Sequence, residues 1–484
     1  MKREILTTSR KALRINLDTN IYGTFAEIGG GQEVARNFFQ AGGASGTVAK
    51  TISAYDKRFS DHLYNQDQPG RYVSEKRLEK MLDTEYRELT SLLGPTTGDR
   101  VKFFVFANTV ATLNFRKDNE AHGWLGIRYQ LNPGEEPNDI ILHVKLLEND
   151  TLLQQNTLGI LGVNLIYGAT YLYRHPNEFL QSLMDNLSRD RIEVTMVRMK
   201  GPQLDYVDNR LLAVQLVNNK MAQAIMFDRH GEVQEPADML YRKNVLAFRG
   251  SFRPITYVGF DMLRKSYAIF KRDEDYAKER TMALCEITMD NLLEKGELDP
   301  HDFLDRVDLL NGMGQNVMVS SIREYHKLVN YFSTFKIKNL RIVMGVPNFL
   351  QVLNKSYYTN LRGGILEALG QLFTDNMKLY IYPTIASVAI DDPTLGDQLL
   401  TSDNLPLPDD IRDLYDYLRK NRKIIVIENA KREWLYINSR YVLKMIQKGE
   451  EGWEKMVPRY VEDVIKQKGL FGYRKKESTD GKTE

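Results

Sequence analysis

From residue 191 onward, short apolar segments alternate with longer amphipathic ones, and this alternation constrains the fold more than any other feature of the chain. The apolar segments read as strands, and they cover residues 192–199, 222–227, 245–248, 282–288, 316–320, 340–346, 379–382 and 424–427. The stretches between them, such as 300–310 and 322–335, have helical spacing. This pattern is typical of parallel β/α units, whose strands are covered on both faces and therefore read as continuous apolar runs.

The sequence thus predicts an α/β fold with a mainly parallel sheet of about eight β/α units over residues 191–473. Eight units can form an open, doubly wound sheet or close into a barrel, and periodicity does not separate the two. The uneven lengths between the units favour the open sheet. In either case the segments 282–288 and 340–346 are expected to be parallel and to share one sheet.

Residues 1–190 differ in character and are predicted to form a separate α+β domain with glycine-rich loops. A strand at 22–28 runs into Gly29-Gly30-Gly31 and a helix, and further strands are expected at 101–107, 124–131 and 139–147. The last two flank the turn-rich sequence NPGEEPN and read as a hairpin.

Composition limits the class of protein, its partners and its cellular compartment. It has 484 residues, of which 42% are hydrophobic and 27% charged, as in ordinary globular proteins. Lys and Arg number 66 against 64 Asp and Glu, so no overall field favours nucleic acid or a membrane surface as a partner. A single cysteine, Cys285, excludes an intrachain disulfide, and the start of the chain lacks a signal-peptide core, so we expect a cytoplasmic protein.

Three segments stand outside the alternating pattern. Residues 156–173 approach the length of a membrane span, but their polar residues and glycines favour a buried helix. Residues 391–410 contain six aspartates and no Lys or Arg, and they read as a solvated loop, with a lid or docking surface as the alternative. Residues 474–484 are predicted to be a disordered tail.

One strand-to-helix turn carries a recognisable motif. Residues 250–255 read GSFRPI, and this stretch resembles the signature of the nicotinamide and nicotinate mononucleotide adenylyltransferases, Gly-(Gly/Thr/Ser)-Phe-Asp-Pro-(Ile/Val)-His-x-Gly-His. Gly250, Ser251, Phe252, Pro254 and Ile255 match that signature. The resemblance implies a Rossmann-like sheet and, as ligand, ATP or another nucleotide with Mg²⁺. In that family, small residues let the turn approach the triphosphate, and two histidines stabilise the charge of the transferring group.

The chain departs from that signature at the aspartate and at the two histidines, which stabilise the transferring group in that family. Arg253 replaces the aspartate, and Thr256 and Gly259 stand in the two histidine positions. A later phosphate-binding motif of the family has a loose counterpart in Ser320-Ser321-Ile322-Arg323. We therefore expect adenylyl transfer to be absent or very weak. Binding of a phosphate or nucleotide, or an ordinary βα turn without a ligand, are the remaining interpretations.

Gly29 and Gly31 form a second candidate site. They follow a strand and precede a helix, an arrangement that can present backbone N–H groups to an anion. Neither the Walker pattern nor the dinucleotide pattern is complete here. The alternative is a tight turn between packed elements.

Polar residues follow the predicted parallel strands, and the carboxyl ends of such strands are expected to converge on one ligand site. These residues are Asp228, Arg229, His230, Arg249, Ser251, Arg253, Asp290, Asn291, Ser320, Ser321, Arg323, Asn348, Glu428 and Asn429. Arginines beside hydroxyl groups indicate a small phosphorylated ligand. His230 or Asp228 is the candidate for proton transfer, and a surface turn is the alternative for His230. The histidine and cysteine spacings predict no metal site.

Two functions follow from these patterns. The first is a cytoplasmic protein that binds a phosphorylated or nucleotide ligand through Arg249, Arg253 and Arg323, with nucleotidyltransferase-like chemistry as its enzymatic form. The second is a non-catalytic scaffold that assembles into a homo-oligomer on a degenerate nucleotide-binding fold. If Arg253 binds no ligand, it is expected to pair with a carboxylate such as Asp261 or Glu286.

Overall fold

The computed structural model describes residues 3–65, 70–274, 276–389 and 396–474. Contacts divide the chain into two compact units, which we call unit 1 (Met1–Ile225) and unit 2 (Met226–Glu484). Part of the acidic segment 391–410 and nearly all of the predicted tail, residues 475–484, lie outside the described residues, so the predictions made for them stay predictions.

Unit 1 is built on a six-stranded sheet with the order β2-β1-β3-β4-β5-β6. The strands are β1 (Ile21–Gly29), β2 (Val48–Ala54), β3 (Lys102–Ala111), β4 (His122–Tyr129), β5 (Asn138–Leu146) and β6 (Ile192–Lys200). β1 runs parallel to both β2 and β3. The sheet then continues antiparallel from β3 through β4 and β5 to β6.

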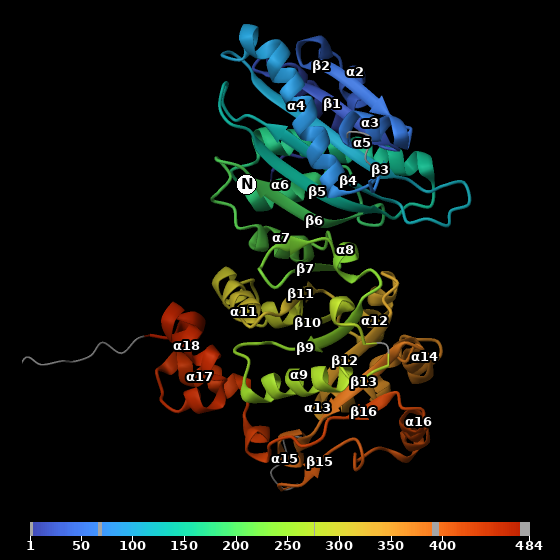
Figure 1. Cartoon of the computed structure of the whole chain (residues 1–484), viewed down its shortest axis with the longest axis vertical. Helices are drawn as coiled ribbons and strands as arrows, with labels where there is room; N and C mark the ends of the chain where they lie inside the picture. Colours follow the sequence, from blue (N-terminus) through green and yellow to red (C-terminus); the bar gives the residue numbers. More distant parts are fainter. Residues whose placement is uncertain (1–2, 66–69, 275, 390–395, 475–484) are drawn as a thin grey trace, which may run out of the picture. The chain divides into compact units, whose positions relative to one another are not determined.

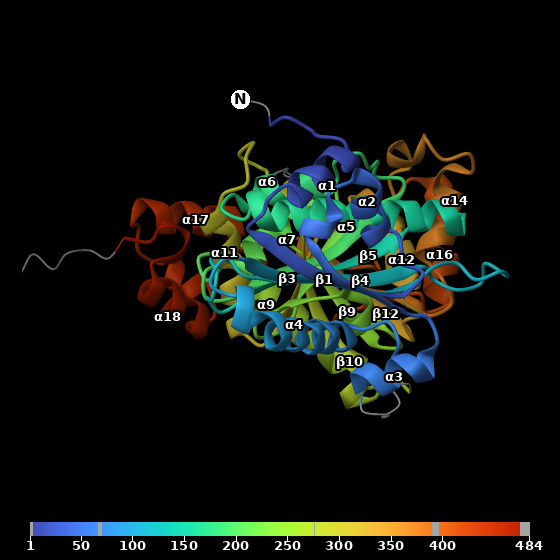
Figure 2. The same ribbon diagram turned by 90° about the horizontal axis from the view of Figure 1, so that it is seen from above.

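Helices cover both faces of this sheet (Figure 2). The helices of unit 1 are α1 (Thr8–Asn16), α2 (Val34–Ala41), α3 (Lys57–Asn65), α4 (Glu75–Thr97), α5 (Thr151–Tyr171), α6 (Pro176–Leu183) and α7 (Asn209–Asn218). α4 lies on one face, where its Leu78 and Leu82 side chains are close to Gly126 of β4. α1, α2 and α5 lie on the other face. Unit 1 is therefore a three-layer α/β/α arrangement.

The segment with the composition nearest to a membrane span is α5, and it is packed inside unit 1. Its Gly162 lies against Val34 of α2 and Phe106 of β3, and Asn164 is fully buried. No helix in the described part of the chain combines the length and the apolar content needed to cross a bilayer.

The segment 192–199 is a strand, as predicted, but it belongs to unit 1 as β6. It pairs antiparallel with β5, with Ile140 opposite Met199 and Leu142 opposite Val197. The contacts divide the chain after Ile225, inside β7, rather than at residue 190. Periodicity identifies an apolar strand but not its partner, and for this reason the sequence assigns β6 to the wrong sheet.

Unit 2 is built on an eight-stranded open sheet with the order β16-β13-β12-β9-β10-β11-β7-β8 (Figure 1). The strands are β7 (Ala224–Phe227), β8 (Val233–Gln234), β9 (Asn244–Arg249), β10 (Thr281–Thr288), β11 (Asn316–Ser320), β12 (Asn339–Gly345), β13 (Met377–Tyr382) and β16 (Ile424–Val426). All neighbours from β16 to β11 are parallel, and β7 and β8 form an antiparallel pair. The prediction that 282–288 and 340–346 share one parallel sheet is confirmed, since β10 and β12 both pair with β9.

The helices of unit 2 connect and cover these strands. They are α8 (Pro236–Leu240), α9 (Tyr257–Phe270), α10 (Met289–Leu292), α11 (Pro300–Gly312), α12 (Tyr325–Ser333), α13 (Val346–Val352), α14 (Gly364–Leu372), α15 (Ala386–Ala389), α16 (Asp409–Lys420), α17 (Ser439–Lys448) and α18 (Arg459–Lys468). A two-stranded ribbon pairs β14 (Thr384–Ile385) with β15 (Leu399–Leu400). The C-terminal helices lie beside α11, where the N–H of Phe471 donates to Asp305 at 2.7 Å.

Candidate functional site

The order of the parallel strands defines a crevice in unit 2. After β7 and β8 at one edge of the sheet, the chain forms the central strand β9, continues to β10 and β11 on one side of it, and then returns to β12 on the other side. At such a reversal, the loops after neighbouring strands leave in opposite directions and open a crevice beyond the carboxyl ends. The GSFRPI turn follows β9 and therefore stands at this point.

A cavity of about 400 Å³ lies there. Its walls come from the segments that follow β9, β10, β11 and β12, together with α17. The lining residues are Arg249, Gly250, Ser251, Arg253, Thr288, Asp290, Asn291, Glu294, Arg323, Tyr325, Asn348, Gln351, Ser439, Arg440 and Leu443. The structure thus brings together seven of the fourteen polar strand-end residues that the sequence singles out: Arg249, Ser251, Arg253, Asp290, Asn291, Arg323 and Asn348.

The turn after β9 is held in a specific shape. Phe252 has a φ of +48°, in the left-handed region, and its ring packs edge-on against Phe248 at 5.3 Å between centroids. A Cβ atom on Gly250 would stand 3.1 Å from the Phe252 ring, so this position favours glycine. The Arg253–Pro254 peptide bond is cis. Gly250 and Phe252 of the motif therefore help to set the backbone conformation of this turn.

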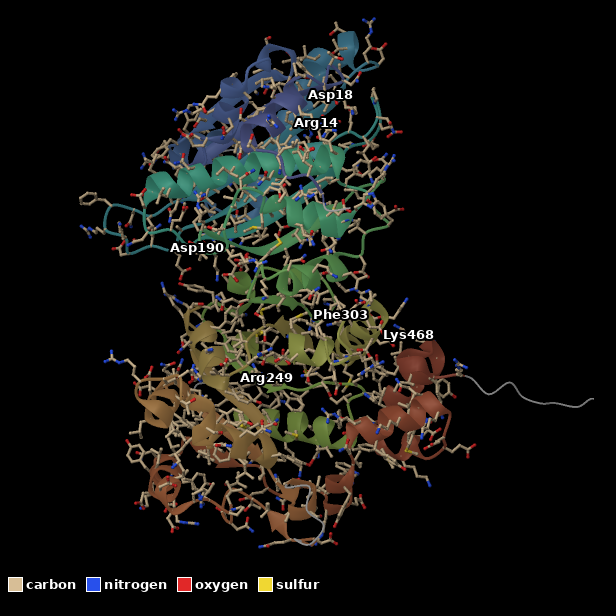
Figure 3. All side chains as sticks on the ribbon, turned by 180° about the vertical axis from the view of Figure 1, so that it is seen from behind. Arg14, Asp18, Asp190, Arg249, Phe303 and Lys468 are labelled. Carbon is tan, nitrogen blue, oxygen red and sulfur yellow. The ribbon has the colours of Figure 1, made fainter. Side chains whose placement is uncertain are left out.

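Arg249 is engaged within the protein. Its Nε and Nη2 atoms donate to the two carboxylate oxygens of Glu286 at 2.9 and 2.8 Å, and Nη1 donates to the carbonyl of Arg323 at 2.6 Å. Its guanidinium also lies 4.6 Å from the centre of the Tyr325 ring. Burial lowers the pKa of Arg249, but the adjacent Glu286 carboxylate more than offsets this effect and leaves the pKa raised. Figure 3 labels Arg249 among the side chains of unit 2.

Arg253 forms an ion pair with a carboxylate of its own unit, as the structural alternative expects, but the partner is Asp302 of α11 and not Asp261 or Glu286. Asp302 also pairs with Arg306, whose Nη1 donates to the carbonyls of Ser251 at 3.1 Å and Asn291 at 3.3 Å. Burial lowers the pKa of Arg306. This buried arginine ties the turn after β9 to the loop after β10.

Two exposed ion pairs stand at the cavity. Arg323 pairs with Asp290 at 2.8 Å, and Arg440 pairs with Glu294 at 3.3 Å. Sequence reasoning missed Arg440 because it lies on α17, far from any predicted strand end. No local pattern marks it.

The serine pair that echoes the family's second phosphate motif is placed differently. Ser320 is fully buried, and its hydroxyl donates to Glu286 at 2.6 Å. Ser321 is exposed. Neither is among the residues that line the cavity. Ser320 therefore supports the Arg249–Glu286 pair instead of contacting a ligand there.

Asp228 and His230 lie at the opposite end of the parallel strands from the cavity. Asn311 Nδ2 donates to the carbonyl of Asp228 at 2.8 Å and to that of Gln315 at 3.0 Å, and Gln315 directly precedes β11. Asp228 is therefore beside the start of β11, whereas the cavity is beyond its end. The Asp228 carboxylate accepts the backbone N–H of His230 at 2.8 Å within the β7–β8 turn. The expectation of convergence is wrong here, because β7 ends where β11 begins.

The glycine-rich turn of unit 1 already holds an anion from the chain itself. The N–H groups of Val34 and Ala35, at the start of α2, donate to the Glu27 carboxylate at 3.0 and 3.3 Å. Burial raises the pKa of Glu27 to about 7. Gly31 is also packed closely, since a Cβ atom on it would overlap the Asn108 side chain. The geometry around Gly29 and Gly31 thus matches the tight-turn alternative better than a phosphate site.

No protein-family model and no curated protein matches the sequence. Solved structures similar to the chain include competence/damage-inducible protein CihA from Agrobacterium tumefaciens, with 15% identity, a TM-score of 0.24, and coverage of 38% of this chain and 99% of the other. They also include nicotinic acid mononucleotide adenylyltransferase from Plasmodium falciparum, with 13% identity, a TM-score of 0.28, and coverage of 48% and 98%. The latter belongs to the group that the GSFRPI stretch resembles. At these scores, neither similarity supports a functional argument.

Proposed function

We propose that unit 2 binds a small phosphorylated, nucleotide-like ligand in the cavity beyond the carboxyl ends of β9 to β12. The observation that carries this proposal is the position of the cavity at the reversal of strand order, where open α/β sheets bind ligands. A volume of about 400 Å³ lies within the range of small-molecule sites.

The charges around the cavity favour an anion. Five guanidinium groups, of Arg249, Arg253, Arg306, Arg323 and Arg440, stand in or directly behind its wall. Four carboxylates oppose them: Glu286, Asp302, Asp290 and Glu294. A fifth, Glu324, also acts on Arg249 and Arg323 but is paired with Lys327. Asp302 is shared by two arginines, so the region keeps a surplus positive charge. A phosphate group, which arginines bind with charge-assisted hydrogen bonds, balances that surplus.

Arg253 is the central contact in this proposal. Its Nε atom is used by Asp302, and its side chain lines the cavity with 11% of its surface exposed. Its planar Nη groups are the donors that we assign to the phosphate. Arg306 and Asp302 fix the direction of Arg253 from behind.

A resident Mg²⁺ is not part of the proposal. Asp290 and Glu294, the carboxylates that line the cavity, are each paired with an arginine. Within the described ranges, no group of three or more His, Cys, Asp or Glu side chains is arranged to hold a metal ion. Any Mg²⁺ would have to arrive with the nucleotide.

The test is a set of thermal melts of the full chain with ATP, ADP, nicotinamide mononucleotide and pyrophosphate. A ligand present at a hundred times its Kd stabilises the folded state by about 2.7 kcal/mol and raises the Tm. The variant is Arg253→Gln, and Arg362→Gln, an exposed arginine of unit 2 that does not line the cavity, is the matched control.

We expect at least one of the four compounds to raise the Tm, and Arg253→Gln to weaken its binding about ten- to hundredfold. The Tm of Arg253→Gln without ligand should change little, because Asp302 keeps its bond to Arg306. Arg362→Gln should bind as the wild type does. Equal affinity of the wild type and Arg253→Gln, or no Tm shift with any compound, would overturn the proposal.

A further inference from the structure

One face of α9 lines a second and larger groove in unit 2. The residues on it are Phe260, Leu263, Arg264, Tyr267 and Ala268, and Lys271 directly after the helix continues the same face. Their spacing of three and four residues is that of a single helix face over three turns. At a rise of about 1.5 Å per residue, this face is about 17 Å long, so most of an extended long acyl chain can lie along it.

The floor of this groove is an uncovered part of a central strand. β10 lies between β9 and β11, and its residues from Leu284 to Thr288 are all buried. Met282 and Ala283, at its start, are only half-buried and line the groove. Parallel strands are normally covered on both faces, so this apolar floor is unusual.

The remaining wall and the size of the groove suit a small ligand. Met313 in the turn before β11 and Tyr460 of α18 complete the lining. The volume is about 930 Å³, within the range of small-molecule sites. The groove shares no lining residue with the cavity of the proposed function.

The charges at this groove have one sign. Arg229, Arg264 and Lys271 line it, and the described lining residues include no carboxylate. Arg264 has a partner in the buried Asp261 at 3.0 Å. Lys271 is exposed and lies 4.9 Å above the Tyr267 ring. An apolar groove with cations at its margin complements a molecule with an apolar body and one anionic group.

We propose that this groove binds an amphiphilic monoanion of the long-chain fatty acid type. The acyl chain lies along α9 and covers Met282 and Ala283, and the carboxylate contacts Lys271 and Arg229. Removing apolar surface from water drives the binding, and the cations select the anionic head group. This inference does not depend on the proposed function, because the two sites share no lining residue.

The test is equilibrium dialysis of radiolabelled palmitate, kept below its aggregation concentration, against the full chain. Three variants separate the parts of the proposal. Ala268→Trp fills the groove from an exposed position on α9, and Lys271→Gln removes the head-group contact. Arg272→Gln removes an adjacent exposed cation that does not line the groove, and it serves as the matched control.

We expect saturable palmitate binding that Ala268→Trp abolishes and that Lys271→Gln weakens about three- to tenfold. Arg272→Gln should bind as the wild type does. Hexadecanol, which has no charge, should bind the wild type and Lys271→Gln equally. Shortening the acid should weaken binding by up to about fourfold for each methylene that leaves the groove.

A melting curve of each variant shows that the fold is retained, and Ala268→Ser provides a conservative substitution if Ala268→Trp does not fold. The proposal is overturned if palmitate binding is not saturable or if a folded Ala268→Trp binds like the wild type. Equal effects of Lys271→Gln and Arg272→Gln would overturn the assignment of the head group. The Tm shift with ATP should be the same with and without palmitate.

Discussion

Arg249 and Glu286 form a two-point ion pair in which the carboxylate is completely shielded from solvent. Glu286 also accepts the Ser320 hydroxyl, and its carbonyl accepts the N–H of Gly250 at 3.0 Å. The pair thus holds together the ends of β9, β10 and β11. Arg249 is a structural support of the candidate site, whereas Arg253 is the arginine assigned to the ligand.

We expect Arg249→Met to lower the free energy of unfolding by about 3–5 kcal/mol, because it leaves a buried carboxylate without its cation. The double variant Arg249→Met with Glu286→Leu should recover much of that loss, since no buried charge remains. Urea denaturation of both variants measures the difference. Arg323→Met removes an exposed arginine instead and should cost less than about 1 kcal/mol. A single variant as stable as the wild type would refute this role for Arg249.

The parallel sheet of unit 2 and the position of its cavity could be predicted from sequence for the same physical reason. Strands buried on both faces must be continuously apolar, and parallel strands must end at one edge. This reasoning places Arg253, Asp290, Asn291 and Arg323 around one cavity, and the structure does so.

Contacts between distant residues could not be predicted in the same way. Asp302 and Arg306 lie on α11 with nothing in their spacing to indicate that they support a turn about fifty residues earlier. Glu27 occupies the start of α2 through side-chain geometry that no glycine pattern encodes. β7 ends at the start of β11, and the apolar pattern gives no strand direction, so the sequence places Asp228 and His230 at the wrong end of the strands.

We expect no adenylyl transfer from ATP to nicotinamide mononucleotide. Thr256, in the first histidine position, is 5% exposed, and its side chain caps no N–H group of α9. Gly259, in the second, lies inside α9, where a Cβ atom would stand 3.2 Å from Ile255. Neither position offers an imidazole to the triphosphate. Chromatography of the reaction products measures turnover, and a rate of about 1 per second or more, as in working enzymes, would contradict this prediction.

The glycine contact inside unit 1 gives a stability prediction. A Cβ atom on Gly162 of α5 would overlap the side chain of Val34, which is fully buried in α2. Gly162→Ala should therefore destabilise the chain by about 1–3 kcal/mol, despite the better helix propensity of alanine.

Gly312→Ala is the control for this contact. Its Cβ atom would overlap only the hydroxyl of Tyr460, a residue that is 43% exposed and can move aside. The Tm of Gly312→Ala should stay close to that of the wild type. If the two alanine variants have the same Tm, the packing of α5 against α2 is less tight than the structure indicates.

The buried carboxylate of unit 1 predicts a dependence of stability on pH. Burial raises the pKa of Glu27 to about 7 in the folded chain, against an ordinary value of about 4.3 when unfolded. Between these values the folded state keeps a proton that the unfolded state releases, so this stabilisation is complete below pH 4 and is lost as the pH rises through 7. The loss is on the order of 3 kcal/mol.

Glu27→Gln removes this titration. The stability of the variant relative to that of the wild type should therefore increase as the pH rises from about 4 to 8. Hydrogen exchange of the peptide covering β1 and α2, followed by mass spectrometry at several pH values and corrected for the intrinsic exchange rate, reports the stability of this region directly. Glu33→Gln is the control, because Glu33 lies next to the start of α2 but its carboxylate pairs with Arg36 at the surface. Its difference from wild type should vary much less over this range, because the charge of Glu33 is the smallest of the causes that act on the pKa of Glu27. Parallel profiles for wild type and Glu27→Gln would show that Glu27 ionises normally in the fold, with the two N–H bonds from Val34 and Ala35 outweighing its burial.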